Sequence, residues 1–195
     1  MAESSLIFIS GGVRSGKSCF AEKLAADYAN KQNGQLHYIA AGQASDLEME
    51  NRIEKHRHDR KKSGLHWTTW EQPVGLKKIA GNFLKTDIIL LDCLTTLLNN
   101  ELFSHASDLK DQAFQQQVMN SIIEGVNQIR KNACVLIIVS NEVLHEPLGS
   151  NELVLAYSKI LGKLHQRIVE RASQAFLIEA GIPLLMKGRE PKCNG

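Results

Sequence analysis

A glycine-rich turn between two segments of opposite character constrains this fold more than any other feature. The turn spans residues 11–18 with the spacing G-x-x-x-x-G-K-S; it follows the apolar run 6–9 and precedes a helical pattern over 18–28. A strand before such a turn and a helix after it are the context that a phosphate-binding P-loop requires. We therefore predict that the chain holds nucleotide phosphates at the start of its first helix.

Each residue type in this loop has a chemical reason to be there. Glycines let backbone N–H groups turn inward around the β- and γ-phosphates, Lys17 adds a positive charge, and Ser18 offers a hydroxyl to Mg²⁺. The alternative is a strand-to-helix turn that binds nothing. The candidate nucleotide-binding residues here are Gly11, Gly12, Val13, Arg14, Ser15, Gly16, Lys17 and Ser18.

Strand patterns alternate with helix patterns along the chain. Apolar, β-branched runs lie at 6–9, 36–40, 87–91, 134–139, 175–178 and 184–186. Helical patterns lie at 18–28, 46–62, 109–131 and 151–172, with shorter ones near 74–83 and 94–102. This alternation predicts an α/β fold: a P-loop NTPase-like domain with a mostly parallel sheet and helices on both faces. We expect one domain over residues 1–188 and a polar tail over 189–195.

Charge and cysteine usage exclude several classes of function. The net charge is only +2, which gives no electrostatic reason to expect a nucleic-acid partner or an anionic membrane. The four cysteines lie far apart without a C-x-x-C pair, which favours reduced thiols in a cytoplasmic protein. The first apolar run leads directly into the glycine loop, so it reads as a strand rather than a signal peptide. No apolar run approaches the roughly 20 residues that span a bilayer.

Asp92 is the second candidate site residue. It closes the run "DIILLD" at the carboxyl end of a predicted strand, where P-loop enzymes place an acid that holds the Mg²⁺ shell. Ser18 and Asp92 are therefore the candidate metal ligands. Alternatively, Asp92 caps the helix that follows, and one residue can do both.

A histidine helix is predicted at 46–62, with the sequence "DLEMENRIEKHRHDRKK". On a helix, Arg52, His56 and Arg60 fall along one side. The flanking positive charges disfavour the imidazolium and leave a nucleophilic imidazole, while the arginines can neutralise phosphate oxygens. The alternative is a solvated basic helix with a surface histidine. A metal pair of His56 with His58 lacks a third ligand.

Five stretches together resemble a known family. In order, "SGGVRSGKS", "YIAAGQASDLEMENRIEKHRHDR", "WTTWEQP", "LLDCLTTLLNN" and "VSNEV" are similar to the motifs of bifunctional adenosylcobinamide kinase/adenosylcobinamide-phosphate guanylyltransferases of cobalamin biosynthesis. The resemblance implies that ATP or GTP, with Mg²⁺, phosphorylates adenosylcobinamide. GTP then donates GMP to adenosylcobinamide phosphate through a guanylylated histidine. It also implies a homotrimer.

The resemblance also implies roles for individual residues. His56 matches the guanylylated histidine, and Lys17 is the second catalytic candidate. Glu71 and Asp92 match acidic positions of the nucleotide site; a carboxylate pairs with guanine N1 and N2, and either residue is a candidate for that role. As an alternative, Glu71 is a surface acid. The remaining matches are a nucleotide-contacting turn (Ala41, Gly42, Gln43) and the segment after the nucleophile (Arg57, His58, Asp59, Arg60).

The carboxyl-terminal third departs from the family pattern. Leu144 and Glu146 replace glycines of the family's loop, and four positions in the helix after it also change. If the family's residues bind substrate or brace a subunit contact, one activity or the specificity for the corrinoid is weakened here. A monofunctional kinase or guanylyltransferase, and a GTP-binding regulatory protein without turnover, therefore stay open as alternatives. The four helix positions are Leu155, Ser158, Lys159 and His165, which replace Arg, Arg, Asp and Asn.

Overall fold

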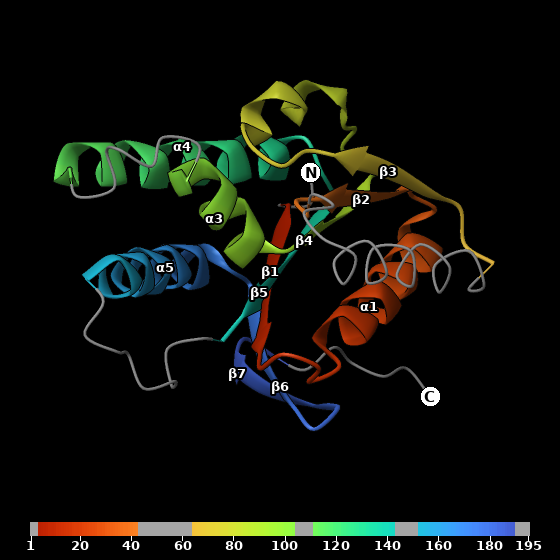
Figure 1. Cartoon of the computed structure of the whole chain (residues 1–195). Helices are drawn as coiled ribbons and strands as arrows, with labels where there is room; N and C mark the ends of the chain where they lie inside the picture. Colours follow the sequence, from red (N-terminus) through yellow and green to blue (C-terminus); the bar gives the residue numbers. More distant parts are fainter. Residues whose placement is uncertain (1–3, 43–63, 104–110, 143–151, 190–195) are drawn as a thin grey trace.

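The computed structural model describes residues 4–42, 64–103, 111–142 and 152–189. These residues form a seven-stranded sheet in the order β3-β2-β4-β5-β1-β6-β7 (Figure 1). All neighbouring strands pair in parallel except β7, which is antiparallel to β6. The sheet confirms the predicted α/β fold. Its strands are β1 (Ser5–Gly11), β2 (Leu36–Ala40), β3 (Trp67–Glu71), β4 (Ile88–Asp92), β5 (Val135–Asn141), β6 (Gln174–Glu179) and β7 (Ile182–Lys187).

Helices cover both faces of this sheet (Figure 1). They are α1 (Lys17–Gln32), α3 (Leu94–Phe103), α4 (Gln112–Lys131) and α5 (Glu152–Arg171). In β1, Ile7 and Ile9 join the apolar cluster that includes α1, whereas Leu6 and Phe8 join the cluster that includes α3, α4 and α5. Successive side chains of a strand point to opposite faces. The central strands are therefore buried on both sides, as parallel sheets are.

The segment 74–83 is not the helix that the sequence pattern predicts. It forms two 3₁₀ turns, η1 (Leu76–Lys78) and η2 (Ala80–Asn82). Gly75 before them has φ 69° and Phe83 after them is extended, so no helix continues in either direction. The buried apolar residues of this segment are spaced three or four apart, which fits a 3₁₀ turn as well as an α-helix. The apolar spacing was therefore ambiguous.

The edge strand β3 is an element that the sequence pattern does not indicate. Its tryptophans, Trp67 and Trp70, are half-buried, and the two threonines between them are exposed. This order lacks the period-two alternation by which strands are recognised. The predicted helix at 46–62 lies outside the described residues. Among the described helices, none combines the length and apolar character needed to cross a membrane.

Candidate nucleotide site

The glycine loop closes on itself between β1 and α1. Gly16 is the N-cap of α1 with φ 93°, and Arg14 also has a positive φ of 61°. The carbonyl oxygen of Gly12 accepts from the backbone N–H of Ser15 at 3.2 Å and from Nζ of Lys17 at 2.9 Å. The predicted strand–loop–helix arrangement is therefore present, and Lys17 is folded inward, with only 7% of its surface exposed.

Close backbone approach explains the glycine at the start of the loop. A Cβ on Gly11 would lie 2.6 Å from the carbonyl oxygen of Ile178 and 2.6 Å from Oγ of Ser15. The turn between β6 and β7 also contacts the loop, because the backbone N–H of Gly181 donates to the carbonyl of Ser15 at 2.9 Å. The loop is therefore fixed by strand β6 and by the final hairpin as well as by its own bonds.

Asp92 lies at the carboxyl end of β4, separated from β1 by the single strand β5. Its Oδ2 accepts from the hydroxyl of Tyr38 at 3.0 Å. The N-cap position of α3 is Cys93, whose carbonyl accepts from the backbone N–H of Leu97 at 3.1 Å. These contacts give the Asp92 carboxylate a partner from β2 and place the capping role on its neighbour.

Cys93 is a poor candidate for a nucleophile despite its position. Burial, together with the neighbouring Asp92 carboxylate, raises the pKa of the Cys93 thiol. Its sulfur lies 3.1 Å from Oγ1 of Thr96, within α3. Because the thiolate is the reactive form, this thiol is held in its unreactive state.

Strand register brings three of the predicted site residues to one edge of the sheet. Ala40, the last residue of β2, pairs with Glu71 on one side and with Asp92 on the other. Ala41 follows directly, and its N–H donates to the Asp92 carbonyl at 3.2 Å. The loop after β1 opens at this same carboxyl edge, because Gly11 pairs with Asn141, the last residue of β5. Gln43, His56, Arg57, His58, Asp59 and Arg60 lie outside the described residues.

Asn100 of α3 supports the site through two hydrogen bonds, and no local sequence pattern indicates this role. Its Nδ2 donates to the carbonyl of Ala41 at 2.8 Å and to that of Pro73 at 3.1 Å. It thereby ties the segments that follow β2 and β3 to one helix. The one indication in the sequence was that Asn100 lies in "LLDCLTTLLNN". This stretch is part of the family resemblance, but the resemblance gave Asn100 no role.

A buried polar network fixes the end of β5 between the loop and Asp92. Oγ of Ser140 lies 3.1 Å from Oγ1 of Thr95 and 2.8 Å from Nε2 of His165. Oγ1 of Thr95 also accepts from the N–H of Asn141 at 2.7 Å. Burial lowers the pKa of His165, and the carboxylate of Glu142 acts in the opposite sense. His165 therefore joins α5 to the end of β5. In the sequence it stood out only as a departure from the family pattern.

The chemistry of the oxygen donors fits Mg²⁺. This ion typically keeps several waters and takes one or two protein oxygens together with phosphates. The hydroxyl of Ser18, at the start of α1, and the carboxylate of Asp92 supply that kind of ligand. Within the described ranges, no group of three or more His, Cys, Asp or Glu side chains could form a metal cage of its own.

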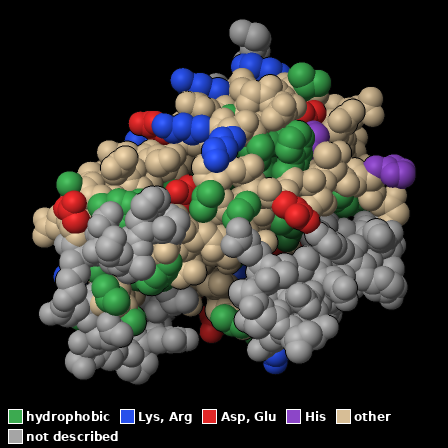
Figure 2. Space-filling view, turned by 45° about the horizontal axis from the view of Figure 1, so that its top comes forward, with side chains coloured by type: hydrophobic (Ala, Val, Ile, Leu, Met, Phe, Trp, Pro, Cys, Tyr) green, Lys and Arg blue, Asp and Glu red, His purple; other side chains and the backbone are tan. Residues whose placement is uncertain are grey.

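Several exposed lysines lie in the connection that leads from β3 to the amino end of β4. On the face that Figure 2 presents, Lys and Arg side chains of the described residues group toward the top of the view. Lys77, Lys78 and Lys85 are exposed in this connection, which leads into the amino end of β4. Lys77 pairs with Glu124 of α4. We therefore assign none of these lysines to the nucleotide site.

A mostly parallel sheet with helices on both faces, a glycine loop that leads into α1 and an acid at the end of a nearby strand define a P-loop nucleotide-binding protein. A KaiC-like protein from Pyrococcus horikoshii shares this fold, with a TM-score of 0.50 and 10% identity over 98% of this chain and 82% of that one. The family model for cobinamide kinase / cobinamide phosphate guanyltransferase matches residues 7–186. The chain belongs to this family of transferases.

Curated relatives match over nearly their whole length. The bifunctional adenosylcobalamin biosynthesis protein CobU of Escherichia coli is 32% identical over 188 residues, covering 93% of this chain and 99% of the relative. The bifunctional adenosylcobalamin biosynthesis protein CobP of Pseudomonas aeruginosa is 34% identical over 181 residues, covering 92% and 96%. The match therefore extends through the divergent carboxyl-terminal third.

Proposed function

We propose that this protein catalyses two consecutive transfers in cobalamin assembly. In the first, an NTP phosphorylates the hydroxyl of the aminopropanol arm of adenosylcobinamide. In the second, GTP donates GMP to adenosylcobinamide phosphate, which yields adenosylcobinamide-GDP and pyrophosphate. The observation that carries this proposal is the closed loop around Lys17 at the same sheet edge as Asp92, in a chain that belongs to the family.

Lys17 and the loop backbone bind the nucleotide phosphates in this proposal. The ammonium of Lys17 exchanges its bond with the Gly12 carbonyl for a phosphate oxygen. Backbone N–H groups at the start of α1 face the same phosphates, where the positive end of the helix favours them. Ser18 and Asp92 supply oxygens to Mg²⁺, which when bound neutralises charge that develops on the phosphates.

The guanylyl step uses His56 as the nucleophile. A ring nitrogen of His56 forms a bond to the α-phosphorus of GTP while the bond from that phosphorus to the pyrophosphate oxygen breaks. A phosphate oxygen of adenosylcobinamide phosphate then attacks the same phosphorus, the phosphorus–nitrogen bond breaks, and His56 is regenerated. This assignment rests on the position of His56 in the family motif.

We propose that the Glu71 carboxylate recognises the guanine base and that the Asp92 carboxylate binds Mg²⁺. In the sheet order, Asp92 is two strands from β1 and Glu71 is four strands from it. Asp92 is therefore nearer the phosphate loop, and its carboxylate already accepts from Tyr38. Glu71 is exposed at the edge of the sheet, where a base bound farther from the loop can meet its carboxylate.

The test is to incubate the protein with Mg²⁺ and α-labelled GTP and to analyse it by denaturing electrophoresis and intact mass. We expect an acid-labile, base-stable GMP adduct that is absent in His56→Asn. A parallel assay follows phosphate transfer from γ-labelled NTP to adenosylcobinamide. GTP binding without an adduct would refute the histidine mechanism and favour a kinase-only enzyme or, without either transfer, a regulatory protein. Light scattering tests the homotrimer that the family resemblance implies.

A further inference from the structure

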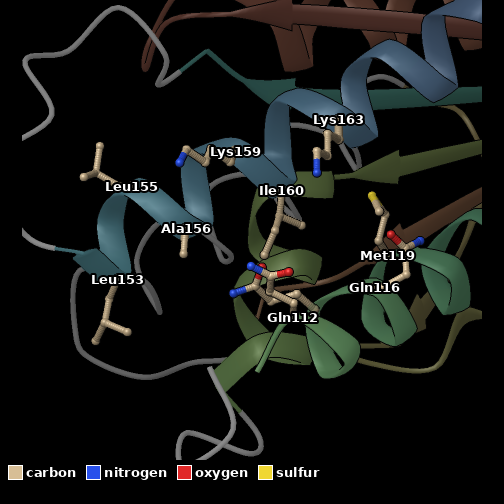
Figure 3. Close-up of a pocket in the computed structure, with 10 residues that line it drawn as sticks. Gln112, Gln116, Met119, Leu153, Leu155, Ala156, Lys159, Ile160 and Lys163 are labelled. Carbon is tan, nitrogen blue, oxygen red and sulfur yellow. The ribbon is translucent and has the colours of Figure 1, made fainter. Parts of the chain in front are cut away.

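A groove of about 620 Å³ runs between the amino-terminal halves of α4 and α5 (Figure 3). Its apolar part includes Met119 from α4 and Ala156 and Ile160 from α5. Met119 and Ile160 are buried, so the floor of the groove is continuous with the apolar core on this face of the sheet. In Figure 3, Ile160 reaches from α5 toward the side chains of α4.

The polar groups that line this groove are amides and ammonium groups. Gln112, Gln115 and Gln116 come from α4, and Lys159 and Lys163 come from α5. No carboxylate occurs among the described lining residues. An amide both donates and accepts hydrogen bonds, whereas an ammonium only donates. This set is therefore complementary to a ligand that presents several carbonyl oxygens together with N–H donors.

One of these amides is held in place. Nε2 of Gln116 donates to Oδ1 of Asn120 at 2.8 Å, and the same oxygen accepts from Nη1 of Arg167 at 3.1 Å. Because Arg167 belongs to α5, these bonds join the two helices that form the groove. A side chain positioned before the ligand arrives loses less conformational freedom on binding.

The groove is linked to the carboxyl edge of the sheet. Tyr157, next to Ala156 on α5, donates its hydroxyl to the carbonyl of Thr95 at 3.0 Å. Thr95 lies in the first turn of α3, shortly after Asp92. Burial raises the pKa of Tyr157, so its phenol stays protonated and able to donate. A ligand in the groove would therefore lie against a helix that is bonded to the start of α3.

Two residues that line the groove are positions where this chain departs from the family pattern. The family resemblance places an arginine at the position of Leu155 and an aspartate at that of Lys159, and both residues line the groove. In Figure 3 both stand at its outer margin. The first change removes a charge and the second reverses one. The outer margin of the groove therefore has an apolar side chain where the family pattern has a positive charge, and a positive charge where it has a negative one.

We propose that this groove binds the corrin ring of the cobinamide substrate by its carboxamide side arms. A corrin ring has an apolar, methyl-bearing periphery interrupted by primary carboxamides, and this matches an apolar floor bordered by amide and ammonium groups. The proposal rests on the proposed function and adds the position of the substrate's bulk. The glutamines pair with the arms, and the apolar floor receives the methyl groups between them.

The test measures equilibrium binding of adenosylcobinamide by dialysis, with the absorbance of the corrin ring as the signal. The double variant Gln112→Leu/Gln116→Leu keeps the bulk of both side chains and removes their hydrogen bonds. We expect about a tenfold loss of affinity, since two hydrogen bonds are removed. Ala156→Trp fills the groove and should weaken binding at least as much. Gln117→Leu is the matched control, because Gln117 is exposed on the same helix and does not line the groove.

In every preparation, the labelling of the protein by α-labelled GTP without adenosylcobinamide measures the nucleotide site independently of corrin binding. Weakened corrin binding in the double variant, with wild-type affinity in the control, supports the groove. Wild-type affinity in both the double variant and Ala156→Trp overturns the groove even if GTP still labels the protein, and the proposed function then stands. A wild-type protein that neither becomes labelled nor binds adenosylcobinamide overturns both.

Discussion

One buried histidine lies beside the carboxyl ends of the strands and another lies near their amino ends, and the two have different roles. At the carboxyl edge, His165 contacts the hydroxyl of Ser140 within a neutral polar network. Toward the amino edge, Nε2 of His37 lies 3.2 Å from Oδ2 of Asp87, an electrostatic contact rather than an aligned hydrogen bond. Nδ1 of His37 accepts from the indole N–H of Trp70 at 3.1 Å. The same type of residue therefore supports a candidate site at the carboxyl edge, as His165, and joins strands at the amino edge, as His37.

The tautomer of His37 follows from its partner. An indole nitrogen can only donate, so Nδ1 of His37 carries no proton and the neutral ring has its N–H on Nε2, toward Asp87. This triad connects three neighbouring strands. Trp70 lies in β3, His37 lies in β2, and Asp87 directly precedes β4. We infer that the amino edge contributes stability and the carboxyl edge contributes chemistry. Four predictions test this division.

Lys17→Ala should have the largest effect, and it should act on turnover. Loss of the ammonium that faces developing phosphate charge should reduce both transfers at least about a hundredfold. The free energy of unfolding should change less than turnover, because the bond from Nζ of Lys17 to the Gly12 carbonyl lies within the loop itself. The measurements are initial rates and urea unfolding, with Lys23→Ala on the exposed side of α1 as the control. Undiminished turnover would argue against the role of the loop.

Asp87→Ala should have the opposite profile. It removes a buried carboxylate that faces His37 and accepts from the backbone N–H of Leu84 at 2.7 Å. We expect a loss of about 2–4 kcal/mol in the free energy of unfolding and unchanged rates where the variant is folded. Urea unfolding beside the exposed control Asp27→Ala checks this. A fully stable variant with impaired turnover would reverse the division between the edges.

His165→Asn should change how stability depends on pH. Burial lowers the pKa of His165 from about 6.5, so below that pH the unfolded chain takes up a proton that the folded chain resists. The contribution of His165 is therefore complete above about pH 6.5 and is lost as the pH falls toward the lowered pKa of the folded state. Asparagine does not titrate, so the variant should lose less stability between pH 7.5 and pH 5.5. Equal slopes in urea unfolding would contradict this.

Trp70→Phe should have the smallest effect. It keeps the ring that packs edge-on against Phe83 and removes the N–H that donates to His37. We expect a loss of about 1 kcal/mol, with turnover unchanged. The matched control is Trp67→Phe, whose ring packs edge-on against Tyr38 in the same strand pair. If the two variants are equally stable, the hydrogen bond to His37 contributes nothing measurable.

Local sequence patterns predicted the parts of the molecule that local chemistry determines. The loop at 11–18 and the carboxyl ends of the strands follow from glycine spacing and apolar runs, and the structure has them where predicted. The helix expected near 74–83 was wrong because its apolar spacing also suits 3₁₀ turns. The strand β3 was missed because an edge strand with two exposed threonines lacks alternation.

Other features depend on contacts between residues far apart in the chain. Asn100 reaches Ala41, and Ser140 joins Thr95 to His165. The groove likewise exists only because α4 and α5 lie beside each other. No local pattern specifies such pairings, since they follow from the order of strands in the sheet. The placement of His56 and its neighbours stays a prediction from the motif.

The bond from Gly181 to Ser15 has a consequence for how the protein is made. A chain emerges from the ribosome with its amino-terminal end first, yet β1 lies between β5 and β6, both from the second half of the sequence. Strand β5 can pair with β1 first, but β1 lacks its second neighbour, and Ser15 lacks its bond from Gly181, until the β6–β7 hairpin has been synthesised. Nucleotide binding should appear late in synthesis, and a nascent chain halted before β6 should be unable to retain GTP.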